Sequence, residues 1–323
     1  MRVPDLRRFL RARTYAFGLL LALVLLVANE IVEPSFASPN NWNTNLALFA
    51  PFALVAMAGT PAILSGGGGI DISVGLIAGF LSNVLVVYLL PGQLGDWYLA
   101  IPVMLAAGAA LGLVNGFSVA VLRYQPVIAT LCMLFVLQGV NQKIVGAPEP
   151  APASWLAHLR SGIGGVPGGL ILIAVPIVVW LVLQRMPFHR TLLSVGGSDA
   201  TAYSSGVNVT AVRLIAYSLG GMFAAVAGLA IATLLQGSDA GAGGEYVLIA
   251  LAAIALGGTP IGGGRGGLTG AITGAAAIFL IQSLLSALNV NAYWNQVVYG
   301  LMLVVGAVIG AQLIAGRRTE APG

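Results

Sequence analysis

The chain carries very little charge. Asp, Glu, Lys and Arg make up 7% of its 323 residues and 58% are hydrophobic, whereas soluble domains have roughly 25% charged residues. A soluble core could not hide so much apolar surface in a chain of this length. We therefore predict an all-α integral membrane protein embedded in the lipid bilayer. The net charge of +4 is too small to indicate a nucleic-acid partner.

Residues that usually carry catalysis or bind metals are equally scarce. The single cysteine, Cys132, excludes an internal disulfide and a cysteine-based metal cluster. Lys143 is the only lysine, and no Gly precedes it and no Ser or Thr follows it, so a Walker A loop for ATP is absent. No G-x-S-x-G or H-E-x-x-H motif occurs. We predict a protein that is not an enzyme and that binds no metal or cofactor itself.

Acidic residues are also nearly absent from the interior of the apolar runs. Carriers driven by a proton or sodium gradient usually bury such groups in the bilayer. Their scarcity argues against ion coupling and favours an energy source on another subunit.

Ten apolar runs are candidates for crossing a bilayer, for which a helix needs about 20 residues. They lie near residues 15–32, 45–64, 70–90, 99–122, 126–144, 168–184, 213–235, 246–258, 267–288 and 294–315. The first run is longer than the apolar core of a secretory signal, and no A-x-A site follows it closely. We therefore predict about ten transmembrane helices in a single permease domain, residues 1–323.

The charges give the orientation of these runs. Of the 14 Lys and Arg residues, only Lys143 and Arg160 fall on the predicted outer side, as the positive-inside rule requires. Both termini are then cytoplasmic, including the segment 1–14 and the tail 316–323. The expected location is the bacterial inner membrane.

Two glycine-rich breaks interrupt the apolar runs. Residues 66–69 are all glycine and lead into Asp71 and Ser73, and glycines cannot continue a helix at low cost. Asp71 either has a functional role or only caps the third span. Residues 257–267 form the second break, expected to be a flexible cytoplasmic turn. Its G-x-G-x-x-G match lacks a preceding strand and is a weak nucleotide signal.

Uncharged polar residues recur on single helix faces. Thr130, Gln138 and Asn141 fall within about 80° of arc, and Gln282 and Ser286 stand one turn apart. Such groups either line a path for a neutral hydroxylated solute or form hydrogen bonds between helices. The candidates for a substrate pathway are Asp71, Ser73, Asn115, Thr130, Gln138, Asn141, Gln282 and Ser286.

The segment 186–212 is the longest polar-leaning run in the middle of the chain. Ser198 can cap a helix, Asp199 suits its first turn, and Gly206 can end it in the left-handed conformation. The pattern predicts a short helix of about two turns in a cytoplasmic coupling loop. An ordinary solvated loop is the alternative.

Several stretches resemble the membrane permease subunits of ribose-type ABC importers, which carry sugars, autoinducers and related solutes. They are GGGGIDISVG at 66–75, LVNGFSVAVLRYQPVIATL at 113–131, SVGGSDATAYSSGVNVTAVRLIAYSLGGMFAAVAGL at 194–229 and IALAAIALGGTPIGGGRGGLTGAITGA at 249–275. They follow the family's order across nearly the whole chain.

The resemblance implies the fold of that family and a set of partners. A second permease copy or a paralogue would complete the pore, and an extracytoplasmic solute-binding protein would deliver a sugar-like ligand. A cytoplasmic ABC ATPase subunit would use ATP and Mg and dock on the loop around residues 196–206. The residues assigned to this coupling are Gly196, Gly197, Ser198, Asp199, Ala202, Gly206 and Asn208.

The sequence departs from the family at two places. Ser198 and Asp199 replace a larger amide and Glu, and residues 246–249 read Tyr-Val-Leu-Ile where Tyr-Glu-Leu-Asp is common. Both acids of that motif are missing, which puts the usual gate chemistry there in doubt. The alternatives are a permease for branched-chain amino acids or nucleosides, an ion-coupled secondary transporter, and a membrane scaffold without transport activity.

Overall fold

Helices dominate the computed structural model, which describes residues 15–152 and 154–318. The structure is 74% helix, and the described residues form no strand, only two isolated β-bridges. The all-α prediction is therefore confirmed. The predicted cytoplasmic segment 1–14 lies outside the described residues, as do residues 319–323 of the tail.

Each of the ten predicted runs holds a helix. Their bounds are α2 (Ala16–Val32), α3 (Trp42–Leu64), α4 (Val74–Val84) with a π-helical extension η2 (Leu85–Leu89), α5 (Trp97–Ala120), α6 (Pro126–Ile144), α8 (Gly168–Arg185), α11 (Val209–Leu235), α12 (Tyr246–Leu256), α13 (Leu268–Ala287) and α14 (Tyr293–Arg318).

Six of the described helices are long and apolar enough to cross a membrane by themselves. The helices at the other four predicted positions have shorter apolar stretches, and α12 has only 11 residues. At 1.5 Å per residue α12 is about 16 Å long, roughly half the thickness of a bilayer core. The architecture is that of a polytopic membrane protein, and ten crossings remain a prediction.

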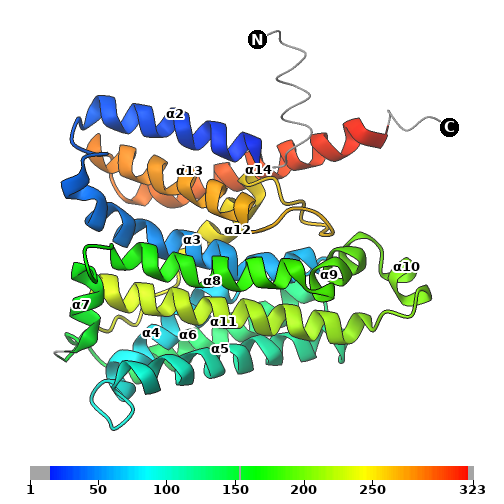
Figure 1. Ribbon diagram of the computed structural model, residues 1–323, viewed down its shortest axis with the longest axis horizontal. Coiled ribbons are helices and arrows are strands. Elements are labelled where there is room, and N and C mark those ends of the chain that lie inside the picture. The colour runs from blue at the N-terminus through cyan, green and yellow to red at the C-terminus, as the bar shows by residue number, and fades with distance from the viewer. Residues whose placement is uncertain (1–14, 153, 319–323) are drawn as a thin grey trace.

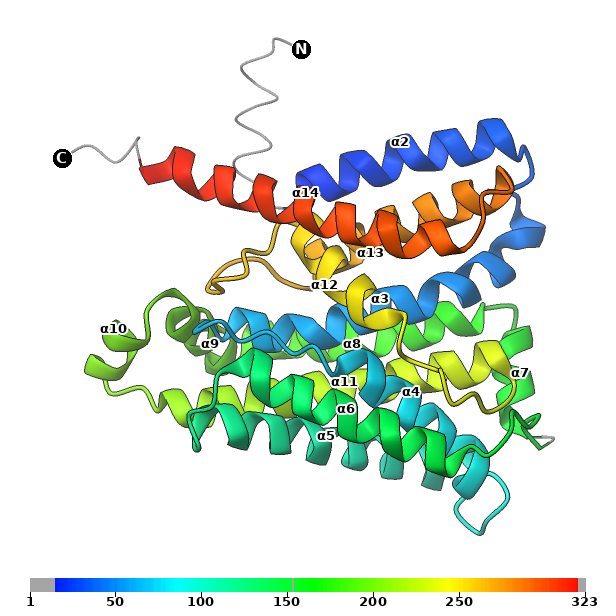
Figure 2. The same ribbon diagram turned by 180° about the vertical axis from the view of Figure 1, so that it is seen from behind.

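Four short elements connect the longer helices. They are η1 (Pro39–Asn41), α7 (Trp155–Ser161), α9 (Pro187–Gly197) and α10 (Asp199–Ser204). Figure 1 shows α7 at one end of the bundle and α10 projecting at the other, and we call these the α7 end and the α10 end. The first turn of α2 and the last turn of α14 both lie toward the α10 end (Figures 1 and 2).

The centre of the bundle is formed by α3 and α11, which are buried along most of their length. In both views α2, α13 and α14 form one side, and α4, α5 and α6 lie on the other (Figures 1 and 2). Helices α5 and α11 pack backbone to backbone, because a Cβ at Gly112 would lie 3.1 Å from the Gly221 nitrogen and would clash with the Tyr217 carbonyl. Small residues allow such close crossings in lipid, where no hydrophobic force drives the helices together.

Candidate functional site

Three glycine turns meet at the α10 end, and we call this contact the glycine junction. It joins Gly66 after α3, Gly196 at the end of α9, and Gly264 in the second break. A Cβ at Gly66 would lie 2.6 Å from the Gly196 Cα, and a Cβ at Gly264 would lie 2.6 Å from the Gly197 nitrogen. Both Gly66 and Gly264 have φ near +70°, where a side chain would add strain. Only glycine allows these backbones to touch.

One main-chain hydrogen bond holds the glycine junction together. The Gly264 N–H donates to the Leu64 carbonyl at 3.2 Å. The second break is therefore packed against the first at this point, which the expectation of a flexible turn did not foresee. Through this contact α9 is coupled to the ends of both α3 and α12, since α12 leads directly into the second break.

Helix α10 confirms the short helix predicted within residues 186–212. The Ser198 hydroxyl accepts a hydrogen bond from the Thr201 N–H at 3.3 Å and caps the helix. Gly206 follows with φ of 83°, as predicted. The sequence did not predict α9, whose eleven residues begin at Pro187 and bring the chain back to the bundle before α10 starts. Ser198 thus separates two helices.

An ion pair ties α10 to the first turns of α11. The Arg213 guanidinium donates from Nη2 to both oxygens of Asp199, at 2.9 and 2.7 Å. The Arg213 side chain is 16% exposed and that of Asp199 is 45% exposed. A Cβ at Gly67 would clash with Nη2, so this glycine leaves room for the guanidinium. Asp199 therefore positions α10 against the bundle.

The remaining residues assigned to coupling divide into two groups. The Ala202 side chain is buried beneath α10, and the Asn208 Oδ1 accepts from the Ala211 N–H at 3.0 Å to cap α11. These two residues therefore stabilise the conformation of the segment 186–212 itself. In contrast, a Cβ at Gly197 or at Gly206 would meet no atom within 4 Å. These positions face open space.

A groove of about 670 Å³ runs beside α10. Its lining includes Arg123, Gln125, Tyr203 and Arg213, which come from α10, α11 and the connection between α5 and α6. Tyr203 is 76% exposed although it is aromatic. Exposed aromatic and arginine side chains around a groove are typical of protein-binding surfaces.

Helix α9 is anchored to the bundle by an aromatic contact. The His189 ring packs edge-on against Trp180 of α8, with ring centroids 5.3 Å apart. Burial lowers the pKa of His189. The imidazole is therefore neutral at neutral pH and adds no charge to this surface.

Four of the predicted pathway residues meet in one buried polar cluster near the first break. The Asp71 Oδ1 accepts from the Ser73 N–H at 2.9 Å and from the Ser73 hydroxyl at 2.6 Å. Asn115 of α5 donates from Nδ2 to the Ser73 Oγ at 2.8 Å and to the Asp71 Oδ2 at 3.3 Å. The Thr130 hydroxyl accepts from the Ile72 N–H at 3.3 Å. These residues hold the broken helix against α5 and α6.

The cluster gives the position of Asp71 and corrects the alternative in which it caps the third span. The Asp71 side chain is 2% exposed, so the bundle does hold a carboxylate in its interior. Ser73, and not Asp71, occupies the N-cap position of α4. Asp71 instead stabilises the turn before α4, because its Oδ1 accepts hydrogen bonds from the N–H and the hydroxyl of Ser73.

The other pathway candidates lie elsewhere. Asn141 is buried and its Oδ1 accepts from the Asn83 Nδ2 at 3.2 Å, while the same Asn83 amide binds the main chain of Asp239. Gln138 is exposed and joins neither group. Gln282 and Ser286 line a pocket at the α7 end. The eight candidates therefore do not form one continuous path within this chain.

Sequence reasoning missed Asn83 and Arg213. Asn83 stands alone as an amide within an apolar helix, and this isolation was a signal that it has a partner in another element. Arg213 was noted as a flanking charge, but its separation of 14 residues from Asp199 hid their contact.

Comparison with known proteins gives the family. A family profile described as "Branched-chain amino acid transport system / permease component" matches residues 43–307. The ribose import permease protein RbsC of Escherichia coli (strain K12) is 32% identical over 299 residues, which cover 90% of this chain and 92% of RbsC. No solved structure gives a significant match.

Two further relatives are also import permeases. The RbsC protein of Bacillus subtilis (strain 168) is 33% identical over 88% of this chain and 89% of its own length. The autoinducer 2 import system permease protein LsrC of Escherichia coli O157:H7 is 30% identical over 95% of this chain and 89% of its own length. With its apolar helices, its glycine breaks and this similarity along almost its full length, the chain belongs to the branched-chain amino acid transport system / permease component family and, within it, to the ribose-type permeases of ABC transporters.

Proposed function

We propose that the chain is the transmembrane permease subunit of an ABC importer for a small neutral polar solute, a monosaccharide or a related sugar. A separate ATPase subunit, which binds ATP and Mg, docks on α9 and α10 and drives it. The observation that carries this proposal is the projection of α10 from the bundle, with Tyr203 exposed, on a base held by the glycine junction and the ion pair of Asp199 with Arg213.

The contacts give a route for movement. A displacement of α10 acts on α11 through Arg213, and a displacement of α9 acts on the ends of α3 and α12 through the glycine junction. Because these backbones touch, little motion is lost in side-chain rearrangement. ATP binding and hydrolysis in the partner would thus change the packing of the central helices and alternate the opening of the pore.

The distribution of charge supports a cytoplasmic position for the α10 end. The described Arg123, Arg185, Arg190, Arg213 and Arg265 lie on the elements of that end, whereas Glu30, Glu33, Asp96, Glu149, Asp239 and Glu245 lie on elements of the α7 end. The distribution follows the positive-inside rule. It supports ten crossings with both termini inside the cell, in the inner membrane. An extracytoplasmic solute-binding protein then meets the α7 end, and a second permease copy or a paralogue completes the pore.

A variant of α10 tests the docking. Tyr203→Ala removes an exposed aromatic group, and such groups dominate many interfaces, so we expect at least a roughly tenfold weaker capture of the ATPase subunit. Tyr293→Ala is the matched control, because Tyr293 is 87% exposed on α14 at the α7 end. The readout is copurification of the coexpressed ATPase from detergent-solubilised membranes. Equal capture by both variants and by the wild type would count against docking at α10.

Reconstitution tests the energy source. Proteoliposomes with the permease, the ATPase subunit and the binding protein should accumulate sugar only when ATP is supplied. Liposomes that contain this chain alone should accumulate none under a proton or sodium gradient. Accumulation in the second experiment would establish the ion-coupled alternative.

A further inference from the structure

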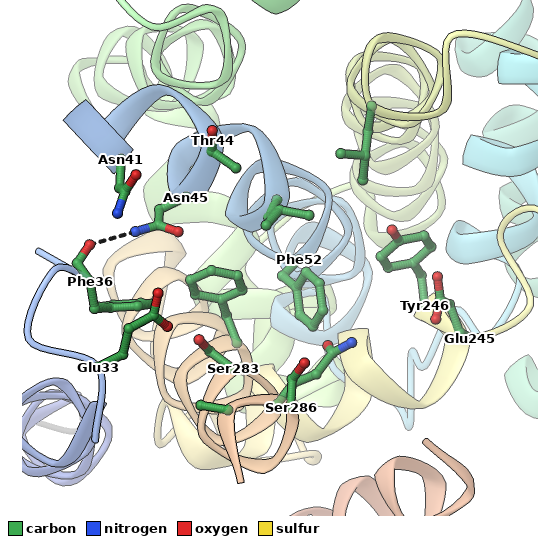
Figure 3. Close-up of a pocket in the computed structure, with 15 residues that line it drawn as sticks. Glu33, Phe36, Asn41, Thr44, Asn45, Phe52, Glu245, Tyr246, Ser283 and Ser286 are labelled. Atoms are coloured by element: carbon green, nitrogen blue, oxygen red, sulfur yellow. Dashed lines mark hydrogen bonds between the residues drawn. The ribbon is translucent and has the colours of Figure 1, made fainter. Parts of the chain in front are cut away.

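A pocket of about 550 Å³ lies inside the single chain at the α7 end. Helices α3, α12 and α13 and the residues after α2 line it. In Figure 3, Asn41 and Asn45 lie on one side of Phe52, Tyr246 lies on the opposite side, and Ser283 and Ser286 lie on a third. Its volume falls within the roughly 300–1,000 Å³ typical of small-molecule sites.

Aromatic rings form the apolar part of this outer pocket. Phe52 packs edge-on against Tyr246 and against Phe279, each with ring centroids 5.8 Å apart. Phe52 and Tyr246 are 6% and 5% exposed, so both rings are held firmly by their surroundings. Phe279 also lines the pocket and is only partly buried, so its ring, which Phe52 holds in place, offers a rigid apolar surface against which the C–H face of a sugar ring can pack.

Free hydrogen-bonding groups lie on the α13 side of the pocket. Within the described part of the chain, the hydroxyls of Ser283 and Ser286 form no hydrogen bond to protein. The Gln282 Oε1 accepts from the Tyr299 hydroxyl at 2.8 Å, which orients the amide and leaves its N–H groups without a protein partner among the described residues. Hydroxyls and an amide can both donate to and accept from sugar hydroxyls.

Charge limits the class of ligand. Glu33 and Glu245 line the pocket, and none of its lining residues is Lys or Arg. A phosphate or carboxylate group on a ligand would meet these two acids without a compensating cation. The pocket therefore disfavours sugar phosphates, and it offers no partner for the carboxylate of an amino acid.

We propose that this outer pocket is an acceptor site, within one permease chain, for a neutral polyhydroxylated ring: a monosaccharide without phosphate or carboxylate groups. The sugar ring packs on Phe279, which Phe52 holds in place, and its hydroxyls bind Gln282, Ser283 and Ser286. The site receives the solute at the outer face before the pore opens inward. This inference rests on the proposed function, which places the α7 end outside the cell.

Ligand-observed NMR on the purified permease tests the site directly. Saturation transfer to D-ribose, D-xylose, D-glucose and D-ribose 5-phosphate is measured on the wild type, on the double variant Ser283→Leu/Ser286→Leu, and on Ser118→Leu. The double variant fills the pocket and removes two hydroxyls. Ser118→Leu makes the same change on α5, where the hydroxyl donates only to the Val114 carbonyl.

We expect transfer to at least one neutral sugar and none to D-ribose 5-phosphate. Loss of two hydrogen bonds, each worth about 1 kcal/mol, weakens binding roughly tenfold or more in the double variant. Ser118→Leu should match the wild type. The proposal is overturned if no neutral sugar gives a signal, if the phosphate binds as well as the neutral sugars, or if the double variant behaves as the control does.

ATP-driven uptake separates this proposal from the proposed function. If the double variant transports at the wild-type rate in the complete proteoliposomes, the pocket is not an acceptor site, although the chain is still an importer subunit. If the wild type shows no ATP-driven uptake of any solute, the proposed function fails, whatever the NMR experiment shows.

Discussion

The two ends of the bundle are built in opposite ways. At the α10 end three glycine turns touch through their backbones, and a two-oxygen ion pair fixes α10 to α11. At the α7 end a pocket of about 550 Å³ remains open between α3, α12 and α13, and its serine hydroxyls have no hydrogen-bond partner among the described residues. One end is closely packed, and the other retains space and unused hydrogen-bonding groups.

The difference indicates that the two ends have different functions. The proposed ATPase subunit needs a rigid connection to the central helices, because a flexible connection at α10 would absorb the movement that ATP hydrolysis produces. A solute needs room and exchangeable hydrogen bonds. Helix α3 borders the glycine junction at one end and the outer pocket at the other, and the shorter α12 lines the pocket and is joined to the junction through the second break. They are the elements through which the two ends can communicate.

The largest effect is expected in the glycine junction. In Gly196→Val the new side chain would overlap the Leu64 carbonyl and the Gly264 nitrogen. Overpacking typically costs about 1–3 kcal/mol, and backbone cannot move aside easily, so we expect a clearly lower melting temperature in detergent. Gly197→Val is the control for stability, since no atom lies within 4 Å of a Cβ there. Equal melting temperatures would contradict the close packing assigned to this end.

The ion pair should give the next largest effect. In Asp199→Arg two cations face each other beside Gly67, α10 loses its anchor, and ATP-driven uptake should fall by roughly tenfold or more. The swap Asp199→Arg with Arg213→Asp should recover most of this loss if the pair acts by positioning α10, as a double-mutant cycle requires. A swap that transports no better than Asp199→Arg would instead mean that the ATPase contacts Asp199 directly.

The buried polar cluster should contribute to stability more than to coupling. Asn115→Leu removes the amide donor from the Asp71 carboxylate, and an under-bonded buried group costs about 1–3 kcal/mol. Adding Asp71→Asn removes the charge and should restore part of the melting temperature. Ser118→Leu, one turn further along α5, serves as the reference. An Asn115→Leu protein as stable as this reference would show that Asp71 does not depend on Asn115.

The smallest effect is expected for Gln138→Leu. Its side chain is exposed on α6 and forms no hydrogen bond within the described residues. Exposed substitutions usually change stability by less than about 0.5 kcal/mol. Both the melting temperature and uptake should match the wild type. A loss of uptake at unchanged stability would place Gln138 against a second permease copy or in the pore between the two copies.

The helices could be predicted from the sequence because apolar runs of this length have few alternatives. The short α10 was also predictable, since Ser198 and Gly206 are local signals for its start and its end. Helix α9 was not, because Pro187, His189 and Arg190 gave a mixed pattern that resembles a loop.

The pattern of polar residues was less informative. Thr130 and Asn141 are about 20° apart on α6, whereas Gln138 is about 80° from Thr130. At that angle Gln138 lies outside the buried face of α6 and is exposed, whereas Leu137 lies on the buried face. Helical periodicity alone does not give the width of a buried face.

The glycine junction could not be predicted at all. Gly66, Gly196 and Gly264 are far apart in the chain, and a single sequence does not show that their backbones meet. The same holds for the outer pocket, which combines residues near positions 33, 52, 246 and 283. Such features follow from the packing of whole helices.

Cysteine labelling tests the central claim most directly, namely that a cytoplasmic ATPase subunit binds α10. Cys132 is the only cysteine, so Cys132→Ser with Ala200→Cys places one thiol on the exposed side of α10. We expect a membrane-impermeant maleimide to label it in inside-out vesicles and not in right-side-out vesicles, and we expect the bound ATPase subunit to protect it. Labelling from the outside only, or labelling unaffected by the ATPase, would contradict the account.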